Sequence, residues 1–300
     1  MFNLNRLKNF LPKFLNKNQY LKNKKLLQIE NEKKLFKENY EQYIYKIQET
    51  IREKKEISFL HSGHAGDMVL AFPVIKELSK THRCKLFIQL NQEMSTYYEN
   101  HPAGNVYINK RICDFLLPLI RKQSYINSVE IFNNQSIDIN LDIIRKLPLN
   151  LTFDNMRYAM HVTGTQADLN KNFLECDEHK ILNKKIVIHR SARYQNNFIK
   201  YNFLEDYEDA YFVGTHDEYK DLKKNLRNLQ FYDCKDFLEM AMLIKSSKVF
   251  IGNSSIGFII AEGLKVPRLL EASPHFPAAQ VHGEKAYDFY FQPHFEKYFH

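Results

Sequence analysis

The stretch HSGHAGDMVLAFP, residues 61–73, decides how we interpret the fold of this chain. It follows an apolar run at residues 57–60 and leads into a helical pattern that extends to residue 82. Gly63 and Gly66 permit a tight turn between the two, because glycine tolerates positive φ values. The stretch therefore predicts a buried strand, a glycine-lined turn and a helix, which together form the first unit of a parallel α/β domain.

One carboxylate, Asp67, directly follows the second glycine, near the start of the predicted helix. An aspartate at this place commonly caps the helix and interacts favourably with its dipole. The alternative is a carboxylate that faces a cleft and takes a proton from a hydroxyl as a general base. His61 and His64 have no apparent third metal ligand, so we expect them, together with Gly66, to contact an acceptor or to be structural.

Strand and helix patterns alternate through the rest of the chain in two series. The first series has a helix at 115–124 and strands at 84–91, 126–134 and 137–144. The second has helices at 216–226, 236–247 and 256–264 and strands at 186–190, 210–215, 229–233, 248–253 and 268–273. This alternation predicts two Rossmann-like parallel-sheet domains that face a cleft, residues 56–180 and 181–300, with the boundary late in the polar stretch 163–185. We expect an aromatic tail, residues 286–300, to pack back onto a domain.

Positive charge is concentrated at the N-terminus. The formal net charge is +8, and seven cations lie in residues 1–25, before the first acidic residue. Apolar residues recur in this segment at helical spacing: Leu4, Leu7, Phe10, Leu11, Phe14 and Leu15. A basic amphipathic helix can bind an anionic membrane surface, and a helix docked on its own protein is the alternative. We expect residues 1–55 to form a helical extension that makes peripheral membrane contact through residues 1–25, and we do not expect nucleic acid as a partner of the nearly neutral remainder.

A basic loop, residues 189–200, follows the predicted strand at 186–190. Arg190, Arg193 and Lys200 place three cations in this one loop. An arginine fork and a lysine point charge both bind phosphate oxygens, so the loop is a candidate seat for a diphosphate. A solvated basic loop is the plain alternative.

Polar residues also stand at the carboxyl ends of two later strands, where parallel sheets bind ligands. These candidates for a ligand site are Gly214, Thr215, Asn253, Ser254 and Ser255. The last three precede a helix whose free N–H groups form an anion site, although capping alone requires no ligand. Gly214 and Thr215 stand at a strand end where a nucleotide base or ribose could bind. Glu262, inside the same helix, is a weaker candidate.

Several classes of function are disfavoured by the sequence. No Asp-x-Asp motif occurs, which weighs against glycosyl transfer that depends on a carboxylate-bound divalent metal, and we expect no metal or cofactor. The four cysteines are far apart and form no CxxC pair, so a reducing compartment is the simpler interpretation. No apolar segment is long enough to span a membrane, and the N-terminus lacks a secretory signal. We expect a cytoplasmic protein with peripheral contact at the inner face of a membrane.

Two stretches resemble the ADP-heptose:lipopolysaccharide heptosyltransferases, the glycosyltransferase family 9-like group. GDMVLAFPVIKEL, residues 66–78, resembles their first strand–turn–helix unit, and KVFIGNSSIGFIIAEGLKVP, residues 248–267, resembles their C-terminal donor loop and helix. FIKYNF, residues 198–203, stands where the group has Lys-x-Trp-Pro. Asn253 and Ser255 replace the Asp and Gly of the donor loop. The resemblance spans about residues 57–270.

This resemblance implies a GT-B fold with the acceptor on the first domain and the nucleotide-sugar donor on the second. It implies inverting, metal-independent transfer of a hexose or heptose to a hydroxyl of a glycan or glycolipid, with Asp67 as the general base. It also implies that Lys200 binds phosphate, or that Arg190 or Arg193 serves instead. The alternatives are a nucleotide-sugar epimerase, which would need no acceptor, and a non-catalytic sugar-nucleotide-binding protein at the membrane surface.

Overall fold

Two parallel β-sheets form the body of the computed structural model, which describes residues 16–94, 101–146, 154–207 and 209–300. The first sheet, of order β3-β2-β1-β4, consists of β1 (Glu56–His61), β2 (Arg83–Ile88), β3 (Ser128–Ile131) and β4 (Ile139–Asn140). The second, of order β10-β9-β8-β5-β6-β7, consists of β5 (Ile186–His189), β6 (Ala210–Phe212), β7 (Gln230–Phe231), β8 (Val249–Asn253), β9 (Arg268–Glu271) and β10 (Ala286–Phe289). All pairings between these strands are parallel, which confirms the predicted α/β class. We call the parts built on the two sheets, residues 56–163 and 186–300, the first and second lobes.

The first lobe departs from the sequence prediction after the glycine turn. The sequence predicts one helix at 68–82, whereas the structure has α4 (Ala65–Leu70) and α5 (Phe72–Leu78) with a break at Ala71. Pro73 causes the break, because it fits the first turn of α5 but has no N–H with which to continue α4.

The other helices of the first lobe are α6 (Lys110–Arg121) and α7 (Tyr158–Thr163). α6 begins earlier than predicted because the Asn109 side chain caps it, accepting a hydrogen bond of 3.0 Å from the Ile112 N–H. The strand predicted at 137–144 is reduced to β4 and continues as the 3₁₀ helix η1 (Leu141–Arg145). η1 and α7 both lie close to the glycine turn.

The second lobe follows the predicted order of elements. Its helices are η2 (Asn202–Asp206), α8 (His216–Lys223), α9 (Phe237–Lys245), α10 (Ile256–Leu264) and α11 (Gln292–Phe299). The aromatic tail packs back as predicted: β10 joins the sheet beside β9, and the Phe289 and Phe295 rings stack with centroids 4.2 Å apart.

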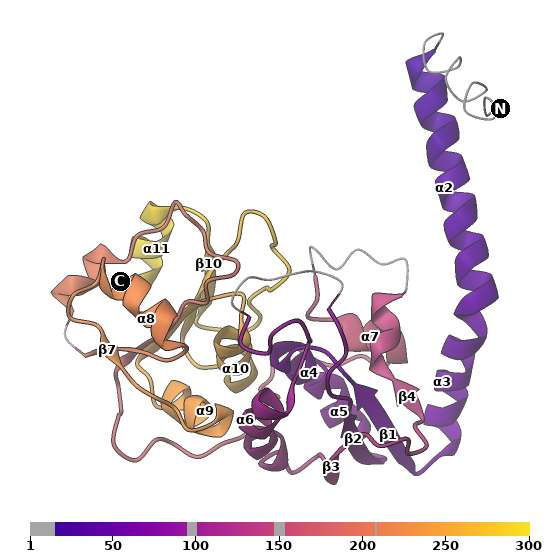
Figure 1. The fold of residues 1–300 in the computed structure, drawn as a ribbon, viewed down its shortest axis with the longest axis horizontal. Helices are drawn as coiled ribbons and strands as arrows, with labels where there is room; N and C mark the ends of the chain where they lie inside the picture. The colour runs from indigo at the N-terminus through magenta and orange to yellow at the C-terminus, as the bar shows by residue number, and fades with distance from the viewer. Residues whose placement is uncertain (1–15, 95–100, 147–153, 208) are drawn as a thin grey trace.

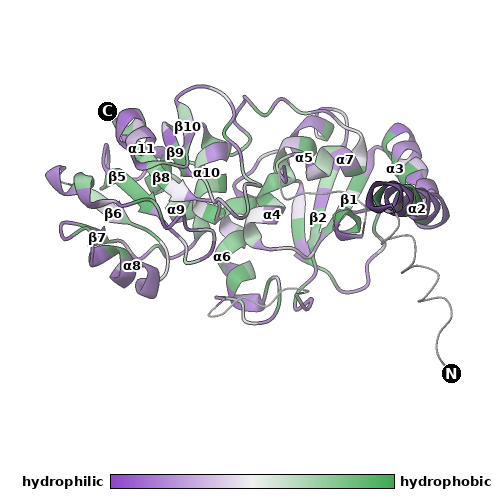
Figure 2. Cartoon of the chain, turned by 90° about the horizontal axis from the view of Figure 1, so that it is seen from above, coloured by the Kyte–Doolittle hydropathy of each residue, from purple (hydrophilic) through white to green (hydrophobic). Residues whose placement is uncertain are grey.

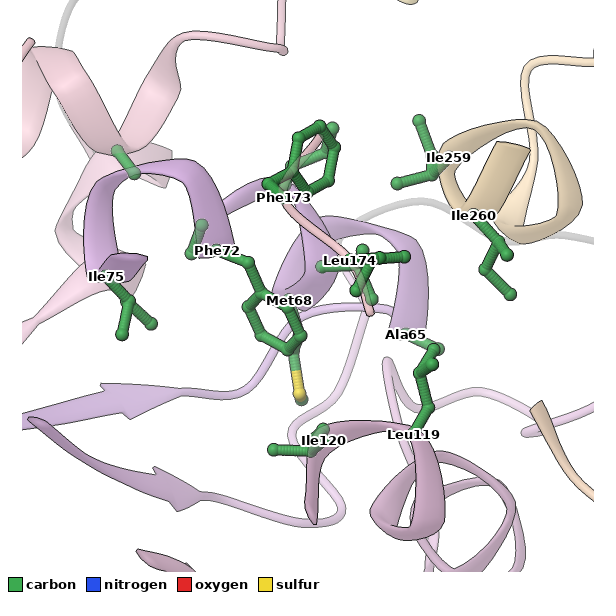
Figure 3. Close-up of a cluster of buried hydrophobic side chains, with 14 of the residues drawn as sticks. Ala65, Met68, Phe72, Ile75, Leu119, Ile120, Phe173, Leu174, Ile259 and Ile260 are labelled. Atoms are coloured by element: carbon green, nitrogen blue, oxygen red, sulfur yellow. The ribbon is translucent and has the colours of Figure 1, made fainter. Parts of the chain in front are cut away.

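One hydrophobic core runs between the two lobes (Figure 3). It contains side chains of α4 in the first lobe and of α10 in the second, among them Met68 and Ile259. Phe173 and Leu174 belong to the same core, and their N–H groups donate to the Gly263 carbonyl at 2.9 and 3.0 Å. Part of the polar stretch 163–185 is therefore buried, and apolar burial holds the lobes together.

An N-terminal arm projects from the first lobe (Figure 1). α2 (Lys17–Asn39) has no buried residue, and Figure 2, which views it nearly along its axis, shows it as mostly hydrophilic. α3 (Glu41–Glu53) joins the arm to the lobe by burying Ile47. The amphipathic face predicted within residues 4–15 lies outside the described residues. Within the described ranges, no helix combines the length and the apolar character needed to cross a membrane.

Candidate active site

A cavity of about 990 Å³ lies between the lobes, and we call it the interlobe cavity. The first lobe lines it with the start of α4, part of the chain between residues 101 and 107, and α6. The second lobe lines it with the loops that follow β5, β6, β7 and β8. These loops leave the carboxyl ends of parallel strands, which is where open α/β sheets bind ligands. The volume lies within the range of sites that bind small molecules.

Asp67 takes part in the capping box of α4, as one alternative from the sequence expects, and it also lines the interlobe cavity. Its Oδ2 accepts a hydrogen bond of 3.2 Å from the His64 N–H. Gly66 lines the cavity beside it. A Cβ atom there would lie 3.8 Å from Ile259 Cγ1, an ordinary contact, so space alone does not require glycine at this position.

His61 differs from the expectation for an acceptor-contacting residue, because it is buried and is not among the cavity-lining residues. Its Nδ1 accepts a hydrogen bond from the Gly63 N–H at 2.8 Å, and its Nε2 lies 2.6 Å from the Tyr158 hydroxyl. Burial lowers the pKa of His61, although the nearby Asp142 opposes this shift. His61 therefore belongs to the structural support of the turn.

His64 lines the cavity, as does His101, a residue that the sequence did not single out. The two ring centroids are 4.9 Å apart, and His64 Nδ1 lies 3.1 Å from the Tyr107 carbonyl, to which it donates. Burial lowers the pKa of both histidines, and the Arg193 cation lowers it further, bringing the pKa of His101 to about 4. Both rings are therefore neutral near pH 7.

The three cations of the basic loop have three different environments. Arg193 lines the interlobe cavity. Arg190 does not, because its buried guanidinium forms a bidentate ion pair with Glu271 at 2.7 and 2.8 Å. Lys200 is exposed and lies outside the cavity lining. Arg193 is therefore the cation of this loop that lines the cavity, whereas Arg190 and Lys200, expected beside it, lie outside the lining.

Asn253 is fully buried and supports the basic loop instead of lining the cavity. Its Oδ1 accepts from the Ser191 N–H at 2.9 Å, and its Nδ2 donates to the Ser191 and Arg193 carbonyls at 2.8 and 2.7 Å. Ser254 and Ser255, which follow it at the start of α10, do line the cavity. The amide of Asn253 thus holds the loop that carries Arg193.

Gly214 and Thr215 line the cavity at the end of β6, as expected. Gly214 has a φ of +147°, and a Cβ atom there would lie 2.9 Å from the Phe212 ring, so the turn requires glycine. Glu262 does not belong to the site, because it is fully buried in an ion pair with Arg268 at 2.6 Å and a second one with Lys265. Its carboxylate neutralises buried cations and has no access to the cavity.

Several lining residues gave no signal in the sequence. His101, Tyr107 and Arg111 come from the first lobe, and His189 and Asp233 come from the second. They stand outside the glycine, serine and arginine patterns that identified the other candidates. His189, at the end of β5, was recognisable only as the first residue of the basic loop. Among the described residues, no group of three or more His, Cys, Asp or Glu side chains is placed to hold a metal ion.

Comparison with known proteins identifies the fold. No family model matches the sequence, and no curated protein matches it. A glycosyl transferase family 9 structure from Veillonella parvula matches with a TM-score of 0.53 at 12% identity, over 78% of this chain and 86% of the other. E. coli heptosyltransferase WaaC with ADP-2-deoxy-2-fluoro heptose gives 0.49 at 8%, over 78% and 92%. The iron-containing dodecameric glycosyltransferase TibC from enterotoxigenic E. coli H10407 gives 0.49 at 12%, over 78% and 62%.

The Veillonella parvula structure supports the expected fold class. At 12% identity the likeness concerns the fold alone, and it extends over both lobes, since 78% of this chain is covered. Together with the two parallel sheets and the interlobe cavity, it confirms the GT-B-like architecture predicted from the sequence.

Proposed function

We propose that this chain is an inverting, metal-independent glycosyltransferase that moves a sugar from a nucleotide-diphosphate sugar to a hydroxyl of a glycan or glycolipid. The observation that carries the proposal is that Asp67 of the first lobe and Arg193 of the second line the same cavity. A general base and a cation that line one cavity, one from each lobe, are what a displacement at an anomeric carbon needs.

The reaction is a single displacement. The Asp67 carboxylate takes the proton of the acceptor hydroxyl while the hydroxyl oxygen forms a bond to the anomeric carbon. The bond from that carbon to the diphosphate oxygen breaks, and its electron pair leaves with the diphosphate. Arg193 and the free N–H groups at the start of α10, beside Ser254 and Ser255, stabilise the departing charge. One displacement inverts the anomeric configuration.

The surroundings favour transfer over hydrolysis. The shared core holds the lobes together around the cavity, which orients the two reactants and limits access of water. The His64 and His101 rings line the same cavity and are neutral near pH 7, so they add no positive charge beside Asp67. The first lobe thus serves as the acceptor side and the second as the donor side.

The proposal is tested first by a thermal-shift screen with ADP-, UDP- and GDP-sugars, because a ligand that binds the native state raises the melting temperature. The donor so found is then assayed with an extract of glycolipids and glycans, by release of the nucleoside diphosphate. Asp67→Asn should lower turnover by about 10²–10⁴-fold while donor binding persists. Asp221→Asn, a matched change on the exposed surface of α8, should leave turnover unchanged.

Three results would contradict the proposal. Full turnover by Asp67→Asn would remove the general base. Conversion of the donor without acceptor would identify an epimerase. Donor binding without turnover under any condition would identify a binding protein.

A further inference from the structure

We propose that Tyr158 is the positioning residue of the general base: its hydroxyl holds the main chain at Asp67 and so aims the carboxylate into the interlobe cavity. This inference rests on the proposed function, because it assigns a support to the residue that takes the proton. Tyr158 is the first residue of α7, far from the glycine turn in the sequence, and its side chain is buried.

The Tyr158 hydroxyl makes two hydrogen bonds to the glycine turn. It donates to the Asp67 main-chain carbonyl at 2.9 Å, and it lies 2.6 Å from His61 Nε2. The His61 and Tyr158 rings meet edge to face with centroids 5.9 Å apart. One side chain thus joins the end of β1 to the first turn of α4, which are the two ends of the glycine turn.

Only one arrangement of protons satisfies these contacts. The Gly63 N–H donates to His61 Nδ1 at 2.8 Å, so the proton of the neutral ring is on Nε2. Nε2–H then donates to the Tyr158 oxygen, and the Tyr158 O–H is left to donate to the Asp67 carbonyl. Burial lowers the pKa of His61 and raises that of Tyr158, which keeps both groups neutral and the direction of the chain fixed.

Residues of η1 hold the rest of the turn. Asp142 Oδ1 accepts from the Ser62 N–H at 3.0 Å, and Arg145 donates to the Ser62 hydroxyl at 3.0 Å while pairing with Asp142 at 2.9 Å. With Tyr158, these contacts fix the backbone on both sides of Gly63. The turn is flexible by composition but restrained by its neighbours, which is the arrangement expected of a preorganised site.

The carboxylate itself has one committed and one available oxygen. Oδ2 of Asp67 accepts from the His64 N–H. Oδ1 accepts no hydrogen bond from the described residues, so it is the oxygen that meets the acceptor hydroxyl. A shift of the Asp67 main chain moves that oxygen directly, and misplacement by about 1 Å can cost about 10²-fold in rate.

The test compares two deletions of a buried tyrosine hydroxyl. Tyr158→Phe keeps the ring but leaves the His61 N–H and the Asp67 carbonyl unpaired. Tyr125→Phe is the matched control, because Tyr125 is also buried and donates to a main-chain carbonyl, that of Phe173, but does not line the cavity. Both variants should melt at a lower temperature than the wild type. Only Tyr158→Phe should lose kcat, by about 10- to 100-fold, with an unchanged Kd for the nucleoside diphosphate of the donor.

The outcomes separate positioning from a merely structural role. A Tyr158→Phe variant that keeps kcat within about twofold of the wild type, or equal losses of kcat in both variants, would overturn the inference.

If Tyr158→Phe does not fold, His61→Leu and His61→Gln take its place. His61→Leu should lose kcat and His61→Gln, which retains an N–H donor for Tyr158, should recover part of it; full kcat in His61→Leu would overturn the inference. A wild-type chain without transferase activity would contradict both proposals, whereas an active wild type with an undiminished Tyr158→Phe variant contradicts only this one.

Discussion

At the scale of single residues, a buried partner decides whether a charged side chain binds a ligand or supports the fold. Arg190 and Arg193 belong to the same loop, yet Arg190 is committed to Glu271 and Arg193 lines the cavity. Breaking a buried pair leaves an uncompensated charge, so Arg190 is not available to a diphosphate. Asn253 likewise supports the fold: it holds the loop, whereas Ser254 and Ser255, which follow it, line the cavity.

Arg193 should therefore carry the donor affinity of the basic loop. Arg193→Ala removes a charge-assisted contact to the diphosphate, and we expect the Kd for the nucleoside diphosphate to rise about 10-fold or more. Titration calorimetry with ADP, UDP and GDP measures this change. Lys200→Ala is the matched control from the same loop, and its Kd should equal that of the wild type because Lys200 is exposed outside the cavity. Loss of affinity in Lys200→Ala instead would reassign the phosphate site.

The histidines of the site predict a pH dependence of stability. The pKa of His101 falls from 6.5 to about 4 on folding, so between these values the unfolded chain binds more protons than the folded chain. The contribution of His101 to the free energy of unfolding therefore decreases as the pH falls below about 6.5. Urea denaturation at about pH 7 and about pH 5 should show a smaller decrease for His101→Gln than for the wild type. His300→Gln, at the exposed chain end, should not alter the decrease, and an equal decrease in all three proteins would refute the assignment to His101.

These residues also mark the limit of the sequence analysis. Asp67, His64 and Arg193 were identified from the residue types expected at strand ends, because parallel folds bring these ends together. The partners of Arg190 and Glu262 are side chains from other elements or turns that only the packing reveals. No local pattern marks His101 or Tyr158, whose roles arise from tertiary contacts.

At the scale of elements, the second lobe was easier to predict than the first. α10 begins after a run of capping residues and ends before Pro267, so its bounds, Ile256–Leu264, match the sequence pattern. In the first lobe, Pro73 divides one apolar pattern into α4 and α5, because the pattern reports which face is buried and not whether the backbone continues. The sequence also missed the change from β4 to η1, because residues 137–143 alternate apolar and polar residues in one strand-like pattern.

The packing of α10 against the segment that joins the lobes, residues 164–185, gives an element-scale prediction. In Gly263→Ala, the added Cβ would lie 2.7 Å from Leu174 and 2.8 Å from Phe173, both buried. We expect the variant to lower the free energy of unfolding by about 1–3 kcal/mol, since overpacking outweighs the helix propensity of alanine. Gly66→Ala in α4 is the control, because its Cβ would meet neighbours at 3.8 Å or more and should not destabilise the protein. Urea denaturation of both variants measures the difference, and equal stabilities would contradict the packing described here.

At the scale of the whole molecule, the shared core makes the interlobe cavity a preformed site. α4 and α10 meet in this core (Figure 3). Asp67 in α4 and Ser255 at the start of α10 line the same cavity. The arm formed by α2 lies outside this arrangement and buries nothing (Figure 1). The proposed chemistry therefore takes place between the lobes, away from the arm.

A crystal structure with a non-reacting analogue of the nucleotide sugar selected by thermal shift is the most direct test of this account. We predict that the diphosphate contacts Arg193 and the start of α10, and that the anomeric carbon faces Asp67 across the cavity. The lobes should keep the arrangement seen in Figure 1. A diphosphate bound away from Arg193, or an anomeric carbon turned from Asp67, would contradict the account.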